Sequence, residues 1–150
     1  MPEESAIERA HEDAREGKSP STQAGEFVRE EIEHVREGKH GARNPKQATA
    51  IGLSKARRAG INLPSPGKGS SSQVRKKAAQ DSRRGRSEHR RSRTRSRATS
   101  RALKREPRST ASTRALSRQA RTAARRRGSA SRRRAARNAV RTRRHTRRSS

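Results

Sequence analysis

The last 70 residues of this chain limit most strongly what it can fold into, because they are rich in arginine and almost free of large apolar side chains. Residues 81–150 contain 27 of the 42 lysines and arginines and three acidic residues, a net charge of +24. Such a segment buries too little apolar surface to offset its ordering entropy, and its like charges repel one another. We therefore expect residues 81–150 to be largely disordered when free, with stretches 112–127 and 131–144 becoming helical on phosphates.

The first 80 residues differ from this tail in both the sign and the density of their charge. Residues 1–40 carry eleven acids and six bases, and residues 41–80 carry nine bases and no acid. Only 24% of the whole chain is hydrophobic, which excludes one 150-residue globular domain. The absence of cysteine excludes disulfides, thiolate metal sites and cysteine catalysis. The acidic N-terminus does not resemble a secretory signal, and no apolar run is long enough to span a membrane, so we expect a cytoplasmic protein.

One helix is predicted over residues 20–37. Ser19 supplies an N-cap, Pro20 occupies the first helical position and Gly38 follows the last turn. Its apolar face consists of Ala24, Val28, Ile32 and Val35, with Phe27 at the edge. The helix period places Glu26, Glu30, Glu33 and Glu37 on the opposite face. We expect this glutamate stripe to be solvated; alternatively, it docks the basic tail of the same or another molecule.

A second helix is predicted over residues 45–59. It begins at Asn44-Pro45, with Gln47 at the position of a capping-box partner, and Gly60 provides a left-handed C-cap on which Ile61 packs back. Four small residues share one face and would allow another helix to approach closely: Ala48, Gly52, Ala56 and Ala59. The six residues between the two helices are long enough for an antiparallel hairpin.

These patterns predict an all-α protein made of a short helical hairpin and a disordered arginine-rich tail. A weaker helix is expected within an acidic N-terminal segment, residues 1–18, ahead of the hairpin at 19–63. Residues 64–80 are expected to form a linker, followed by the tail at 81–150. The thin apolar core makes the hairpin marginally stable alone, so weak self-association through Val28 and Ile32 is a further possibility.

Residues 25–41 and 46–60 also carry a resemblance to a known family. The stretch from Lys46 to Gly60, KQATAIGLSKARRAG, is its most specific part. It resembles a family of small basic bacterial proteins of unknown function. The resemblance implies a bacterial cytosolic protein without known enzyme activity, and it carries over no functional residues. In composition, the tail is similar to the basic tails of linker-histone-like bacterial proteins and protamines.

The predicted function is sequence-independent binding, coating or compaction of nucleic acid, with a nucleoid location. Arginine accounts for 34 of the 42 bases, and its guanidinium binds phosphate in a bidentate manner. DNA is favoured over RNA because the tail has no aromatic residue on which single-stranded bases would stack. The candidate contacts are Lys46, Lys55, Arg57, Arg58, Arg83, Arg84, Arg90, Arg91, Arg125, Arg126, Arg127, Arg132, Arg133, Arg134, Arg143 and Arg144.

Several alternatives stay open at this level. The tail is also suited to structured RNA, or it adds electrostatic affinity to an assembly protein whose hairpin binds a protein partner. Residues 38–41, GKHG, mimic the backbone-clamping loop of KH domains, although a helix end followed by a turn explains them as well. The two helices are also compatible with a helix-turn-helix, which would require a third helix and outward base readers.

No enzyme activity, cofactor or metal site is predicted. The histidines at positions 11, 34, 40, 89 and 145 do not cluster with carboxylates at metal-ligand spacing in the sequence, so we expect them on the surface. Paired acids such as Glu30 and Glu31 are placed on a helix surface, and no catalytic grouping of serine, histidine and aspartate or phosphate-binding glycine loop is evident.

Overall fold

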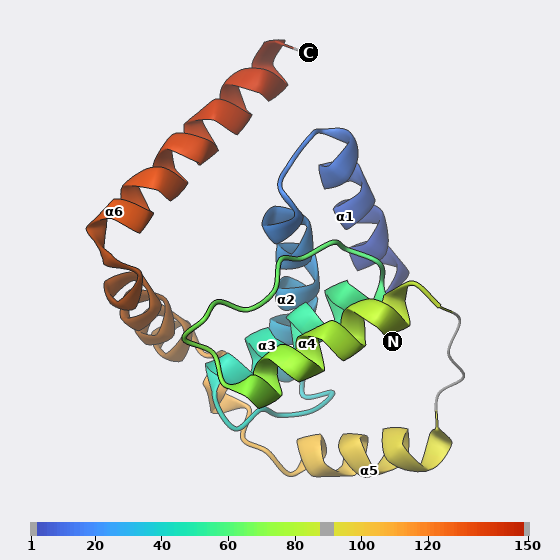
Figure 1. The fold of residues 1–150 in the computed structure, drawn as a ribbon. Helices are drawn as coiled ribbons and strands as arrows, with labels where there is room; N and C mark the ends of the chain where they lie inside the picture. The colour runs from blue at the N-terminus through green and yellow to red at the C-terminus, as the bar shows by residue number, and fades with distance from the viewer. Residues whose placement is uncertain (1–2, 88–91, 149–150) are drawn as a thin grey trace.

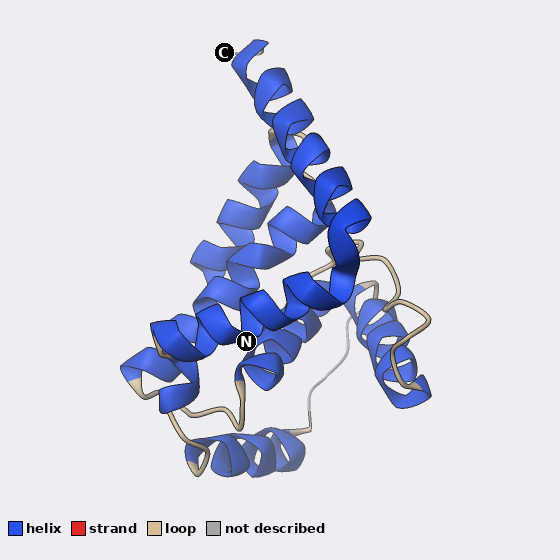
Figure 2. Cartoon of the chain, turned by 90° about the vertical axis from the view of Figure 1, so that its left-hand side faces the viewer, coloured by secondary structure: helices blue, strands red, loops and turns tan. Residues whose placement is uncertain are grey.

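The computed structural model describes residues 3–87 and 92–148, which form helices and loops without any strand. Its elements are α1 (Glu4–Arg15), α2 (Pro20–Glu37), α3 (Pro45–Arg58), α4 (Ser72–Gly85), α5 (Arg93–Lys104), a 3-10 turn η1 (Ser109–Ala111) and α6 (Thr113–Arg148). Helices α1 to α4 form a packed body, while α5 is set apart from this body and α6 extends away from it (Figures 1 and 2).

The capping signals in the sequence define α2 and α3 as predicted. The Ser19 side chain accepts a hydrogen bond from the backbone of Thr22, and α2 ends at Gly38 in the left-handed conformation. Asn44 accepts the backbone N–H of Gln47 at the start of α3. At the other end, the N–H of Ile61 bonds to the carbonyl of Ala56 and buried Ile61 packs on the last turn. This is a Schellman ending, which explains the positive φ of Gly60.

The small-residue face of α3 allows α2 to approach closely. Ala48, Gly52 and Ala56 are buried, and a Cβ atom at Gly52 would lie only 2.7 Å from the Cα of Val28. Phe27, expected at the edge of the apolar face, is fully buried at its centre. The contact with α3 leaves Val28 half-buried, so the face predicted for self-association already has an intramolecular partner.

Helix α1, which the sequence predicted as a weaker helix, and helix α4, which it did not predict, complete the body around the hairpin. Ala6 and Ala10 of α1 are fully buried against Phe27 and Ala56. Helix α4 begins at Ser72, inside the segment expected to be a linker, and it packs on α3. The two helices approach so closely at Gly85 that a Cβ atom there would overlap the carbonyl oxygen of Arg57.

The prediction of a largely disordered tail is wrong. Helices α5 and α6 cover most of residues 92–148, and a serine begins each of them: Ser92 accepts the N–H of Arg95, and Ser112 accepts the N–H of Ala115. Gly128, with φ 72° and ψ 166°, interrupts α6 and divides it into two straight halves. Alanine and arginine have high helix propensity, so the backbone becomes helical although little of it is buried. The like-charge repulsion used to predict disorder did not outweigh this local preference.

A docked segment, residues 103–111, ties the tail to the body. The N–H of Gly41 bonds to the carbonyl of Leu103 at 2.8 Å, and that of Ala42 bonds to the carbonyl of Pro107 at 3.1 Å. The side chain of Arg36 donates to the carbonyl of Ala111, which is itself buried. Ala111 packs in a small core with Val35, Ala42 and Ala48, bordered by Ile32. The start of α6 is therefore anchored between α2 and α3.

Replacing Gly41 with Ala should loosen this anchor. The added Cβ would overlap the backbone carbonyl oxygen of Glu106, which cannot rotate away as a flexible side chain could. We expect a cost of about 1–3 kcal/mol to docking, as for overpacking elsewhere, and faster amide hydrogen exchange at Ala42. Gly69→Ala is the matched control, because nothing lies within 4 Å of its Cβ position. Unchanged exchange at Ala42 would contradict this account of the anchor.

Candidate nucleic-acid interface and buried polar cluster

Three stripes of basic side chains run along α5 and the two halves of α6. In each stripe, four bases recur at helical spacing, so they share one face of the helix. All twelve are exposed: Arg93, Arg97, Arg101 and Lys104 on α5; Arg114, Arg118, Arg121 and Arg125 on the first half of α6; and Arg133, Arg137, Arg141 and Arg144 on the second half. From its first to its last base, each stripe extends about 16 Å along the helix axis.

The stripes have no acidic partner among the described residues. Glu106 is the one acid in positions 92–148, and it faces Arg43 with a closest N–O distance of 3.8 Å. Each stripe therefore presents uncompensated positive charge to solvent. A duplex carries about one phosphate charge per 1.7 Å of axis, so a 16 Å stripe of four bases lies along a length of duplex with roughly nine phosphates, about twice the number of bases.

Most arginines predicted from the sequence lie on the surface of α6 or α4. Arg83 is exposed and Arg84 is half-buried, while Lys46 is exposed at the start of α3. Arg90 and Arg91 lie outside the described residues. The exposed candidates on α6 are Arg125, Arg126, Arg127, Arg132, Arg133, Arg134, Arg143 and Arg144. These candidates were chosen from runs of two or three consecutive arginines. Among the eight on α6, only Arg125, Arg133 and Arg144 belong to a stripe.

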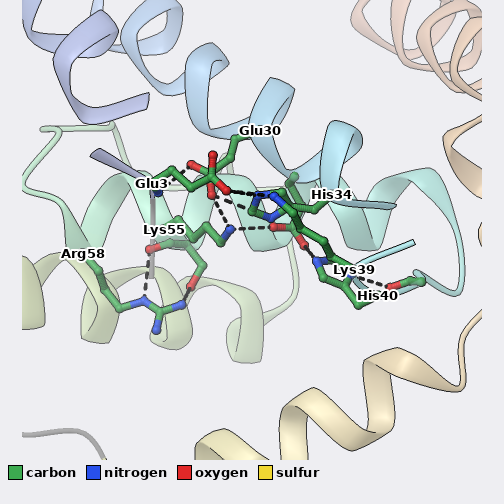
Figure 3. A network of polar contacts seen from close by, with 10 residues as sticks. Glu3, Glu30, His34, Lys39, His40, Lys55 and Arg58 are labelled. Atoms are coloured by element: carbon green, nitrogen blue, oxygen red, sulfur yellow. Dashed lines mark hydrogen bonds and ion pairs between the residues drawn. The ribbon is translucent and has the colours of Figure 1, made fainter. Parts of the chain in front are cut away.

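Lys55 occupies a different environment from the other candidates. Its Nζ lies 2.7 Å from Glu30 Oε1 and 2.9 Å from Glu31 Oε2, and its side chain is 13% exposed. Figure 3 shows this ammonium group directed at Glu30 within a continuous polar network. Glu30 is 2% exposed and Glu31 is fully buried. The expectation that Glu30 belongs to a solvated stripe is therefore wrong, and Lys55 forms an ion pair with each of these two carboxylates.

Arg57 and Arg58 also make contacts inside the chain. Arg57 donates to the carbonyl of Pro64, and Arg58 donates to both the carbonyl and the hydroxyl of Ser54. That hydroxyl donates in turn to Asp81 of α4 at 2.7 Å. Asp81 is 2% exposed, so these contacts stabilise the packing of α4 on α3. We accordingly leave Lys55 and Arg58 out of the proposed interface.

The loop that mimics a KH clamp has its amide groups already occupied. The N–H groups of Gly41 and Ala42 bond to the carbonyls of Leu103 and Pro107 within the docked segment. The guanidinium of Arg108 lies against Gly38, where a Cβ would be 2.7 Å from one of its terminal nitrogens. The loop thus anchors the tail, and the described residues contain no strand on which a KH sheet would be built.

Two histidines of the body are not surface residues, contrary to expectation. His34 is 9% exposed, and His40 is half-buried with its ring edge-on to that of His34. His34 Nε2 donates to Glu3 Oε1 at 2.8 Å, and Lys39 Nζ donates to the same oxygen (Figure 3). Hydrogen bonds from Lys39 and then His34 lower the pKa of Glu3 to about 2. Glu3 is therefore ionised at neutral pH and fixes the orientation of the His34 ring.

Sequence reasoning missed the grouping of Glu31, His34 and His40 because its members come from two segments, helix α2 and the loop that follows it. Glu31 and His34 are one helical turn apart on α2, but His40 reaches them only after the chain reverses at Gly38. The signal available in the sequence was the spacing of Glu31 and His34 on one face of a predicted helix. Nothing in that spacing showed that the face would be covered by α3.

The comparisons with known proteins leave the family of the chain open. No helix in the described part of the chain is long and apolar enough to cross a membrane. The resemblance to small basic bacterial proteins remains a prediction. No protein-family model matches the sequence, and neither the curated proteins nor the solved structures include a match.

Proposed function

We propose that this protein binds duplex DNA without sequence specificity, through the basic stripes of α5 and α6. The observation that carries the proposal is the set of twelve exposed bases, arranged in rows and without an acidic partner among the described residues. Guanidinium groups on one face of a helix can contact successive phosphates while the helix lies in or across a groove. The body of α1 to α4 then serves as the anchor from which these helices project.

Duplex DNA suits these helices better than RNA does. The major groove of B-DNA is roughly 12 Å wide and admits an α-helix, whereas the major groove of A-form RNA is deep and narrow. The single aromatic residue of the chain, Phe27, is fully buried and offers no surface for stacking unpaired bases. These features favour DNA duplexes over RNA duplexes and single strands.

The arrangement of the basic helices supports coating or bridging of DNA. Gly128 divides α6 into two halves that point in different directions, and α5 lies apart from both (Figure 1). Three separate rows can therefore engage different stretches of a duplex or two neighbouring duplexes. If the resemblance to bacterial proteins holds, this activity would place the protein in the nucleoid.

The test is the affinity of the full chain for duplex DNA, duplex RNA and single-stranded DNA at several matched salt concentrations. We expect duplex DNA to bind most tightly, with similar affinity for unrelated sequences. The logarithm of the association constant should fall with that of the salt concentration at a slope of about −0.9 for each neutralised phosphate. A preference for RNA, or a slope near zero, would contradict the proposal.

The assembly protein predicted as an alternative has less support. Among the described residues, the large apolar side chains that are exposed are Val74 and Val140, which lie on different helices. Helix α1 packs on α2, α4 packs on α3, and Ala111 of the docked segment packs against residues of both hairpin helices. From the sequence, deletion of residues 81–150 should abolish DNA binding but leave binding of a protein partner intact. In the structure, this deletion would also remove the docked segment and expose the core around Ala42. Substitutions in the stripes are therefore the cleaner test.

A further inference from the structure

A second, independent feature of the molecule is the convergence of Glu31, His34 and His40 beside the buried ion pairs. Each of these side chains offers a ligand atom, and these atoms all lie within 4.8 Å of one another. Glu31 is fully buried and His34 nearly so, while His40 closes the group from the loop after α2. The cluster lies far from any basic stripe in sequence, and phosphate binding does not explain it.

The hydrogen bonds of His40 determine which of its nitrogens can accept. Its Nδ1 lies 3.0 Å from the carbonyl oxygen of Gly41, and a carbonyl only accepts, so Nδ1 carries the proton. A neutral ring then has a lone pair on Nε2, and this atom lies 3.2 Å from Oε1 of Glu31. That buried carboxylate oxygen has no hydrogen-bond partner. Two acceptor atoms at this separation can share a cation, because each can supply a lone pair to it.

The surrounding groups orient the other two candidate ligands. His34 uses Nε2 to donate to the carboxylate of Glu3, which leaves its second ring nitrogen, Nδ1, without a hydrogen bond; the nearest carboxylate oxygen to it, Oε1 of Glu30, is 3.9 Å away. Lys55 contacts Oε2 of Glu31 at 2.9 Å, which leaves Oε1 for the cation. Carboxylates and backbone carbonyls that accept the second N–H of a histidine ligand are the usual outer partners of metal sites.

We propose that Glu31, His34 and His40 bind one divalent transition-metal ion of the zinc type. Two imidazoles and one carboxylate are a known zinc ligand set, with a fourth position open to water or another ligand. Nitrogen donors select zinc-like ions over magnesium and calcium, which prefer oxygen. Because His40 belongs to the loop that holds the docked segment, the metal would fasten this loop to α2 and so reinforce the anchor of α6.

The test is a titration of the full chain, stripped with EDTA and dialysed, with ZnCl2 in a calorimeter and with CoCl2 in a spectrophotometer. We expect one equivalent of Zn²⁺ to bind, a higher melting temperature with excess metal, and the visible bands of low-coordinate Co²⁺. MgCl2 should produce none of these effects. His40→Ala should weaken zinc binding by at least about 100-fold, which is the upper range for the loss of an outer partner.

The matched control is His11→Ala, which removes an exposed histidine of α1 and should leave zinc binding unchanged. If His40→Ala fails to fold by circular dichroism, the more conservative His40→Gln keeps the size and polarity of the side chain and serves in its place. Absence of saturable zinc binding by the intact chain would overturn the proposal, as would unchanged binding in a His34→Ala/His40→Ala variant. The first result would instead indicate that the 3.2 Å contact between His40 and Glu31 is a direct side-chain pair with no metal between them.

Discussion

Replacing Arg114, Arg118, Arg121 and Arg125 with Gln is expected to lower the affinity for duplex DNA by about three orders of magnitude at about 0.15 M salt. Four lost phosphate contacts reduce the slope of log affinity against log salt concentration by about 3.6. If the variant and the wild type bind equally near 1 M salt, this difference in slope gives the stated loss at about 0.15 M. These side chains are exposed and pair with no acid among the described residues, so the fold should not change. Fluorescence anisotropy over a range of salt concentrations measures both quantities.

The matched control removes the same charge from outside the stripes. Replacing four exposed bases on α1, on α4 and on either side of α4 with Gln, namely Arg15, Lys68, Lys76 and Arg86, also lowers the net charge by four. We expect this control to change the slope by less than about one unit, since these bases do not form a row. Arg→Lys at the four stripe positions should keep most of the slope. Equal losses in the control and the stripe variant would show that only total charge matters.

Lys55→Met is expected to produce the largest loss of stability, about 3–5 kcal/mol of unfolding free energy at neutral pH. The substitution leaves Glu30 and Glu31, which are almost fully buried, without their shared cation. Burial of an unpaired carboxylate raises its pKa, so the variant should recover stability as the pH falls and these groups bind protons. Urea unfolding at neutral and mildly acidic pH, with EDTA present, measures both effects.

Two further variants test whether this loss arises from the unpaired charges. Lys46→Met removes an exposed lysine from the same helix and should cost less than about 0.5 kcal/mol. Adding Glu30→Gln and Glu31→Gln to Lys55→Met should restore much of the stability, because no buried charge is then left unpaired. A loss in Lys55→Met no larger than that in Lys46→Met would show that the buried ion pairs contribute little.

Local signals predicted the ends of α2 and α3 correctly because those signals act within a single turn of the chain. Ser19 and Asn44 cap helix starts through their own side chains, and Gly60 adopts a positive φ that other residues avoid. The spacing of Ala48, Gly52 and Ala56 likewise predicted a close helix contact without naming the partner. Each of these features depends on neighbouring residues alone.

The buried cluster was not predictable because burial of a charged residue depends on what covers it. Glu30 and Glu33 are equally polar in sequence, yet Glu30 is 2% exposed beneath Lys55 whereas Glu33 is exposed. Helical spacing predicted that both glutamates would be exposed to solvent. The difference arises because α3 passes over one side of α2, and no local pattern indicated that direction.

The sequence by itself determined the helical class of the body, the ends of its central helices and the concentration of positive charge after residue 80. These follow from propensity, capping and composition, which act locally or are simple totals. The tertiary structure decided that residues 103–111 dock on the loop at Gly41, and that Lys55 serves the interior. It also decided that His34 and His40 meet Glu31. The physical reason is that these contacts join residues distant in sequence, and their energies exist only once the helices have packed.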